Sequence, residues 1–319
     1  MSSASDIRAR RHRWRWLALA VVLGLGILEA LGRLIPTPPI RSAWTIPILL
    51  EKLASVERDP VLFWRLPGRG APSYREGARH RVLCLADSVT VMDDGHGYPE
   101  LLEALLDGRI PGGVSVWNAG VPGYTTEQAL RFLDRYSSAP APELATIQLA
   151  WNDHTPALGG HPDHEVVMPP EWALHLQGVL DGSGLYQLLR RAAGKGAYVP
   201  GPGLRVPPER YEANLRALAA KLRERGATVV LVTCPFLSDH EDYTAVHVDY
   251  NQRAARVAGA LGVALVDPVP RFIGHRELFL RPETDHVHFN PDGSRIIAEM
   301  IVETLDREGW IGAASAASR

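Results

Sequence analysis

The sequence predicts an α/β protein with about five parallel strands between two layers of helices, preceded by one membrane helix. Short apolar runs bounded by Gly, Pro, Asn or Asp are typical of strands that are covered on both faces. Segments with helical periodicity separate these runs, and the alternation indicates parallel strands joined by helical crossovers. A basic N-terminus followed by an apolar stretch predicts the membrane helix. The predicted strands are residues 81–86, 114–118, 145–150, 227–233 and 262–266.

The last predicted helix has a clear start, because Asn290 can cap it and Pro291 suits its first turn. The other helical segments are recognised by apolar residues that recur on one face. A domain over residues 79–312 is expected to contain them, and residues 313–319 are expected to form a disordered tail. The predicted helices are residues 98–108, 126–136, 207–226, 248–262 and 291–309.

Residues 1–13 are predicted to form a basic cytoplasmic tail, and residues 14–35 a single-pass signal anchor. Glu29 and Arg33 are four residues apart and can pair on one helix face. The positive charge before the apolar segment keeps the N-terminus in the cytoplasm and exports the rest of the chain. The alternative is a signal peptide cleaved near the small-x-small sequence at residues 30–32, which would release a secreted protein.

Two further segments lie outside the strand–helix alternation. Residues 36–78 are interpreted as a linker and a packing arm: Pro36–Pro39 favours a stiff spacer, and residues 58–70 (RDPVLFWRLPGRG) carry apolar anchors without a period. Residues 155–207 are rich in Pro, Gly and His and too long for an ordinary connection. They are predicted to form a lid-like insertion.

Composition excludes one class of partner. The formal net charge is -2, which provides no clustered basic surface for nucleic acid. Cys84 and Cys234 lie in or beside apolar strand-like runs and are expected to be small buried residues. If their strands are not neighbours, the two cysteines are too far apart for a disulfide.

Polar and glycine residues follow the first three predicted strands. Ser88 follows the first strand on a turn, where its side chain and N–H are accessible. Gly123 follows the second strand and permits close backbone approach, so its N–H can donate to an oxyanion. Asn152 follows the third and can aim its amide into the same space. Each residue alone is also explained by a helix cap or a turn.

Asp285 and His288 lie three residues apart in the loop before the last helix. A general base needs a partner that orients it, and within one loop the carboxylate can hold the imidazole. Reactive residues of parallel sheets gather at the carboxyl ends of the strands. The coincidence of these signals at one sheet edge predicts a Ser–His–Asp site of the acyl-transfer kind.

These motifs resemble, in order and spacing, the four blocks of the GDSL/SGNH hydrolase family over roughly residues 79–305. Alanine stands at positions 86 and 150, where the family usually has glycine. The matching blocks are Asp87-Ser88, Asn118 with Gly123, Asn152-Asp153, and Asp285-x-x-His288.

The resemblance implies a three-layer, flavodoxin-like fold and a serine esterase or acylhydrolase that works through an acyl-enzyme intermediate. Ser88 would be the nucleophile, His288 the base and Asp285 its orienting partner. The oxyanion would be held by the N–H groups of Ser88 and Gly123 and by the side chain of Asn152. No cofactor and no metal are expected.

The expected substrate is an acyl ester: a small molecule, a lipid or an acylated glycan. The chain is expected to sit in the bacterial cytoplasmic membrane through its N-terminal helix, with the catalytic domain in the periplasm. Three alternatives stay open. One is an O-acyltransferase that modifies an extracytoplasmic glycan with the same triad, and another is a non-catalytic binding protein. The third is a metal site built from His154, His161, Asp163 and His164, or from residues 285–288, although no HExxH motif is present.

Overall fold

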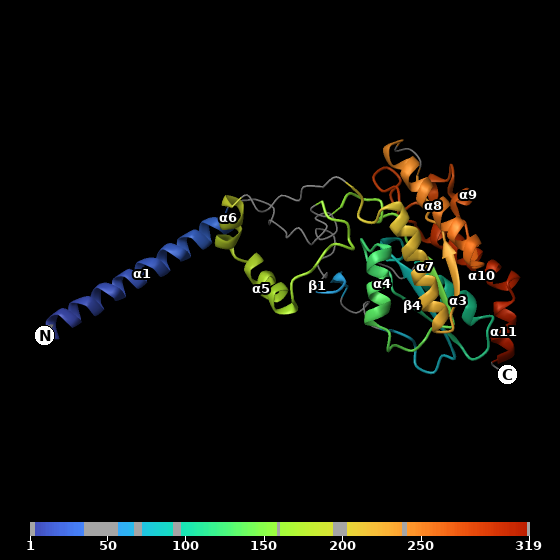
Figure 1. Cartoon of the computed structure of the whole chain (residues 1–319), viewed down its shortest axis with the longest axis horizontal. Helices are drawn as coiled ribbons and strands as arrows, with labels where there is room; N and C mark the ends of the chain where they lie inside the picture. Colours follow the sequence, from blue (N-terminus) through green and yellow to red (C-terminus); the bar gives the residue numbers. More distant parts are fainter. Residues whose placement is uncertain are drawn as a thin grey trace. The chain divides into compact units, whose positions relative to one another are not determined.

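The computed structural model describes residues 4–34, 57–66, 72–91, 97–157, 160–193, 203–237 and 241–317. The chain divides into two compact units (Figure 1). The first consists of Met1–Pro47 and Pro169–Tyr198, and the second of Ile48–Met168 and Val199–Arg319. The predicted spacer Pro36–Pro39 lies outside the described residues.

The second unit is built on a five-stranded parallel sheet, which confirms the predicted fold class. Each strand lies within about two residues of its predicted bounds. The sheet order is β4-β3-β5-β6-β7, the flavodoxin-like order in which the first strand lies between the second and third. The strands are β3 (His80–Ala86), β4 (Val114–Asn118), β5 (Leu144–Gln148), β6 (Thr228–Val232) and β7 (Ala264–Val266).

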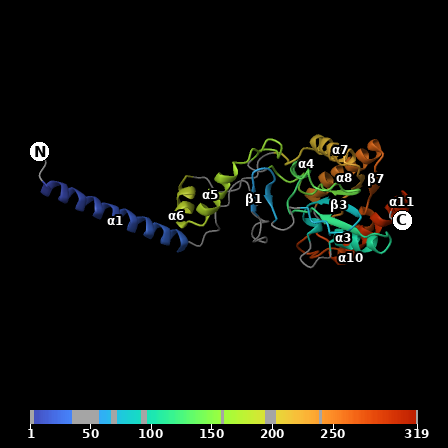
Figure 2. The ribbon, with the colours of Figure 1, turned by 90° about the horizontal axis from the view of Figure 1, so that it is seen from below.

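Helices cover both faces of this sheet (Figure 2). Along β3, Val82 and Cys84 join the apolar cluster formed with α3 and α10, while the alternate residues Leu83 and Leu85 are also buried. Successive side chains of a strand point to opposite faces, so a sheet covered twice buries both sets. One layer contains α3 (Tyr98–Asp107) and α10 (Pro291–Arg307), and the other contains α4 (Thr126–Arg135), α7 (Pro208–Glu224) and α8 (Glu241–Leu261).

The strand order brings the ends of three strands together. β3 pairs with β4 in the register Cys84↔Asn118 and with β5 in the register Ala86↔Gln148. The segments that follow β3, β4 and β5 therefore leave the same edge of the sheet side by side. Ser88, Gly123 and Asn152 are in these three segments.

A two-stranded antiparallel hairpin, β1 (Glu57–Asp59) and β2 (Phe63–Arg65), precedes the sheet. Its turn is capped by Asp59, which accepts hydrogen bonds from the N–H groups of Val61 and Leu62, both at 2.9 Å. Leu62, Phe63 and Trp64 are buried. Residues 57–66, which belong to the segment interpreted as a linker and packing arm, thus have regular structure, and we call them the arm hairpin.

The first unit contains α1 (Ala4–Leu34), α5 (Glu171–Asp181) and α6 (Gly184–Ala192). Among the described residues, one helical stretch, Arg11–Leu34, is long and apolar enough to cross a membrane, with a mean hydropathy of 2.0 over an 18-residue window. The predicted Glu29–Arg33 pair forms at 2.7 Å. α5 and α6 belong to the predicted insertion 155–207, whose ends belong to the second unit. A lid function for the insertion stays a prediction.

Two predicted boundaries are wrong. The tail expected to be disordered from residue 313 forms the greater part of α11 (Trp310–Ala317). Its Ile311 and Ala314 are buried in the same apolar cluster as α10, and this contact orders the segment. α8 begins at Glu241, seven residues before the predicted start at residue 248.

Candidate active site

Ser88, His288 and Asp285 form a continuous row of hydrogen bonds. The Nε2 atom of His288 lies 2.7 Å from the Oγ of Ser88. Its Nδ1 atom lies 2.9 Å from each carboxylate oxygen of Asp285. The structure therefore brings Ser88 into contact with His288, which lies 200 positions later in the sequence.

Asp285 is held in its ionised form. Burial alone would raise its pKa, but the hydrogen bonds and charge of His288 outweigh this effect, so the pKa of Asp285 falls to about 2. The N–H groups of Val287 and His288 also donate to its Oδ1. A carboxylate that is charged and held by three donors keeps the imidazole in one orientation.

Backbone contacts fix the loop that carries His288. The carbonyl oxygen of His288 accepts from the N–H of Leu280 at 2.8 Å, and the carbonyl of His286 accepts from the N–H of Leu237 at 2.9 Å. Immediately afterwards, the side chain of Asn290 accepts from the N–H groups of Asp292 and Gly293, which confirms the predicted cap. His288 is thus held two residues before the capped start of α10.

Asp87 connects the Ser88 turn to Asn152 through its two carboxylate oxygens. Its Oδ1 accepts from the N–H of Val89 at 3.0 Å and caps the short 3₁₀ turn Ser88–Thr90. Its Oδ2 accepts from the Nδ2 of Asn152 at 2.9 Å. Burial raises the pKa of Asp87 to about 6, and the Val89 hydrogen bond opposes the shift. One N–H of the Asn152 amide is therefore anchored beside the Ser88 turn.

Gly123 lies in the loop that joins β4 to α4, and its φ of 81° is in the left-handed region that favours glycine. The N–H of Val121 donates to the carbonyl of Ala86, so this loop is tied to the residue two positions before Ser88. Among the described residues, Phe63 is the one non-glycine with positive φ. Ala86 and Ala150 accordingly stand in ordinary backbone conformations, and their methyl groups are accommodated.

Asn118, from the second block, connects three segments around the Ser88 turn through its side-chain amide. Its Oδ1 accepts from the N–H of Gly120, and its Nδ2 donates to the carbonyl of Thr90 and to the carboxylate of Glu100. These contacts join the end of β4, the Ser88 turn and the start of α3. A Cβ on Gly120 would overlap the Thr90 hydroxyl, so the loop passes close to the Ser88 turn.

The residues considered for a metal site have other partners. Asp163 pairs with Arg205 at 2.7 Å, and both side chains are fully buried. His154 Nε2 lies 2.8 Å from His247 Nδ1, and burial lowers the pKa of these histidines to about 3 and about 4. Within the described ranges, no group of three or more His, Cys, Asp or Glu side chains is placed to hold a metal ion.

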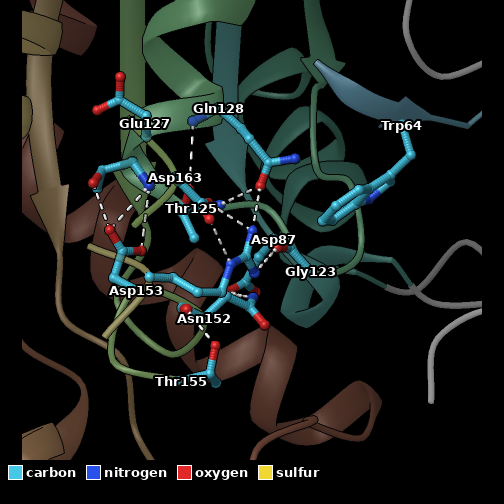
Figure 3. Close-up of polar contacts among 12 residues, drawn as sticks. Trp64, Asp87, Gly123, Thr125, Glu127, Gln128, Asn152, Asp153, Thr155 and Asp163 are labelled. Atoms are coloured by element: carbon cyan, nitrogen blue, oxygen red, sulfur yellow. Dashed lines mark hydrogen bonds and ion pairs between the residues drawn. The ribbon is translucent and has the colours of Figure 1, made fainter. Parts of the chain in front are cut away.

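The sequence did not point to the residues that support the Gly123 loop. Trp64, Asp163 and Arg205 contact this loop or one another, yet they belong to segments without a recognisable pattern. Figure 3 shows Trp64 and Asp163 on the same side of the site as Gly123. The apolar run around Trp64 had suggested a packing arm. No local signal distinguished Arg205 from the many other arginines of the chain.

A family model for the GDSL-like Lipase/Acylhydrolase family matches residues 84–296, more than half of the 319 residues. The chain belongs to the GDSL-like lipase/acylhydrolase family. The match begins within β3 and ends within α10, and it contains Ser88, Asn152 and His288. This GDSL-like chain carries the arm hairpin and α1 outside the matched region.

A search of curated proteins gave no match to this GDSL-like chain. Among solved structures, it is similar to a lipase/acylhydrolase from Enterococcus faecalis, with 16% identity, 72% of this chain and 96% of that chain covered, and a TM-score of 0.49. It is also similar to an acetylxylan esterase from Geobacillus stearothermophilus, with 20% identity, 72% of this chain and 95% of that chain covered, and a TM-score of 0.46. A third similar structure is an alpha/beta hydrolase enzyme from the metagenome of Lake Arreo, Spain, with 19% identity, 79% of this chain and 100% of that chain covered, and a TM-score of 0.48.

Proposed function

We propose that this GDSL-like protein is a serine-dependent ester hydrolase that works through an acyl-enzyme intermediate. The observation that carries the proposal is the row Ser88–His288–Asp285, in which Nε2 lies 2.7 Å from the nucleophile and Nδ1 lies 2.9 Å from the carboxylate. This is the arrangement that lets one imidazole take a proton from a serine and return it to a leaving group.

In the first half-reaction, the Oγ of Ser88 attacks the ester carbonyl while Nε2 of His288 takes the hydroxyl proton. The negative charge on the carbonyl oxygen is held by the N–H groups of Ser88 and Gly123 and by the Asn152 amide. The tetrahedral intermediate collapses, the C–O bond to the alcohol breaks, and the alcohol leaves with the proton from His288. Asp285 keeps the imidazole oriented and stabilises its charged form.

In the second half-reaction, water attacks the acyl-Ser88 ester and His288 takes its proton. Collapse of the second tetrahedral intermediate releases the carboxylic acid, and the proton returns to Ser88. The net reaction consumes one ester and one water and yields one acid and one alcohol.

We further propose that α1 is a retained membrane anchor and that the catalytic unit lies outside the cytoplasm. The basic residues before the apolar stretch give this orientation. Glu29 accepts hydrogen bonds from Ser183 Oγ at 2.7 Å and from the N–H of Leu185 at 2.9 Å. A Cβ on Gly32 would come within 2.4 Å of the Gly184 backbone, so α1 and α6 pack closely. Cleavage near residues 30–32 would remove this packing surface.

The enzymatic test measures hydrolysis of p-nitrophenyl esters, from acetyl to long-chain, by the full chain in detergent micelles. Ser88→Ala is the matched variant, because it removes one oxygen from a turn whose cap is made by Asp87. Turnover that depends on Ser88 is expected. A folded wild-type chain that neither hydrolyses any ester nor reacts with a serine-directed phosphonate would overturn the hydrolase.

The location is tested by membrane fractionation and intact mass. The expected result is a chain in the membrane fraction whose mass includes residues 1–35. A soluble, periplasmic chain that has lost these residues would contradict the anchor.

A further inference from the structure

Trp64 of the arm hairpin contacts the peptide that carries the proposed oxyanion donor. Its indole Nε1–H donates to the carbonyl oxygen of Pro122 at 2.9 Å. The Pro122 carbonyl and the Gly123 N–H belong to one peptide unit. A trans peptide is planar, so its C=O and N–H point in opposite directions. A donor that holds the Pro122 oxygen therefore sets the direction of the Gly123 N–H.

The next peptide is held from another segment. Nη1 of Arg205 donates to the carbonyl oxygen of Gly123 at 2.7 Å. The same guanidinium donates to both carboxylate oxygens of Asp163 and to Oε1 of Gln128, so each of its three nitrogens donates to a buried partner. In Figure 3, Thr125, Gln128 and Asp163 lie together beside Gly123, and the ring of Trp64 points toward the same loop.

Trp64 is itself fixed in place. The hydroxyl of Tyr124, the residue after Gly123, donates to the carbonyl of Trp64 at 2.7 Å. Nε2 of Gln128 donates to the carbonyl of Leu62 at 2.8 Å, and the Arg205 guanidinium lies 5.5 Å from the centre of the Trp64 ring. The side chain of Trp64 is 3% exposed. The indole is thus a rigid, desolvated donor.

We infer that Trp64 is a positioning residue for the reaction: it orients and polarises the Gly123 peptide so that the N–H meets the oxyanion. This inference rests on the proposed function. Glycine at φ 81° has little intrinsic preference for one peptide orientation, so both flanking carbonyls need outside partners. A hydrogen bond accepted at the carbonyl also strengthens the N–H of the same peptide as a donor. Trp64 lies before the region matched by the family model, which begins at residue 84.

The test compares Trp64→Phe with Trp117→Phe in the full chain in detergent micelles. Both tryptophans are buried, and within the described part of the chain Nε1 of Trp117 has no hydrogen-bond partner. Trp117→Phe therefore controls for the lost ring volume. The readouts are kcat and KM for the best p-nitrophenyl ester, and the affinity of a boronic acid, which forms a tetrahedral anion on the serine.

Trp64→Phe should lower kcat by about tenfold, because one oxyanion donor is misoriented but not removed. The affinity for the boronic acid should fall by a similar factor, and KM should stay within about twofold of wild type. Trp117→Phe should keep kcat within about twofold. Equal kcat values in the two variants, or a loss confined to KM, would overturn the inference. A wild-type chain without Ser88-dependent turnover would instead refute the proposed function, and the inference with it.

A second variant covers the case in which Trp64→Phe does not fold. Replacing Trp64 with 3-benzothienylalanine keeps the shape of the indole and exchanges its N–H for sulfur. The same loss of about tenfold in kcat is expected. Wild-type kcat in this variant would overturn the positioning role.

Discussion

The carboxylate of Asp87 accepts a hydrogen bond from the amide of Asn152 at 2.9 Å, across the ends of β3 and β5. The residue before the proposed nucleophile thereby orients a proposed oxyanion donor. One amide N–H is committed to Asp87, so the other is the one that can meet substrate. Ser88 and Asn152 are consequently placed by a single buried carboxylate. Substitution of Asn152 tests the oxyanion role, and substitution of Asp87 tests the burial of the carboxylate.

Asn152→Ala should lower kcat by about 10²–10³-fold, as expected when one oxyanion donor is removed. KM should change far less, because the donor acts mainly on the charge that develops in the transition state. Steady-state kinetics with the p-nitrophenyl ester panel measures both. Wild-type kcat in Asn152→Ala would exclude the oxyanion role of this residue.

Asp87→Asn tests the burial of the carboxyl group through pH. The pKa of Asp87 is raised from 3.8 to about 6 in the folded chain, so the folded state binds this proton more tightly than the unfolded state. The stabilisation from the protonated form is complete below about pH 4 and is lost as pH rises through about 6. Relative to the variant, wild type should lose about 3 kcal/mol of unfolding free energy across this window.

Urea unfolding of both chains in micelles, followed by tryptophan fluorescence at several pH values from 3 to 8, measures this difference. The variant lacks the titrating group, so effects of pH on all other groups cancel in the comparison. A stability difference that stays constant with pH would show that Asp87 keeps an ordinary pKa.

Asp285→Asn should lower kcat by about 10³-fold or more, because the amide cannot hold Nδ1–H of His288 as a carboxylate does. Asp292→Asn is the control, since Asp292 is exposed at the start of α10, the helix that follows the loop of Asp285. The kcat of both variants is measured with the ester on which wild type turns over fastest. Similar activity of Asp285→Asn and wild type would remove Asp285 from the triad.

Arg205→Met should destabilise the chain by about 3–5 kcal/mol, because it leaves the buried carboxylate of Asp163 without its cation. The double variant Arg205→Met with Asp163→Leu should recover most of this loss, since no buried charge is left unpaired. Urea unfolding measures all three chains. A double variant no more stable than Arg205→Met would show that the hydrogen bonds of Arg205, and not its charge pairing, dominate.

The strands and most helices could be predicted because their signals are local. β3 and β5 are continuous apolar runs, and the α10 start is marked by Asn290 and Pro291. Boundaries that depend on distant packing were not predictable. α11 is ordered by the contact of Ile311 and Ala314 with the α10 cluster, which no local pattern announces.

The candidate residues of the site could also be predicted, since each lies in a segment that follows a strand or precedes the last helix. What the residues did not reveal was how they are held. Asp87 accepts from the N–H of Val89 within its own turn, but its contact with Asn152 spans 65 positions. Asp163 was grouped with possible metal ligands because its histidine neighbours in sequence suggested it, whereas its partner in space is Arg205.

By itself, the sequence determined the alternation of strands and helices, the order of the four blocks and the apolar N-terminal segment, because these depend on periodicity and on neighbouring residues. Tertiary structure alone decided that Trp64 holds the Pro122 carbonyl and that Arg205 holds the Gly123 carbonyl. These bonds join residues 58 and 82 positions apart. Such contacts form only when the sheet order has brought separate loops to one edge, and they leave no repeat or spacing in the chain from which they could be read.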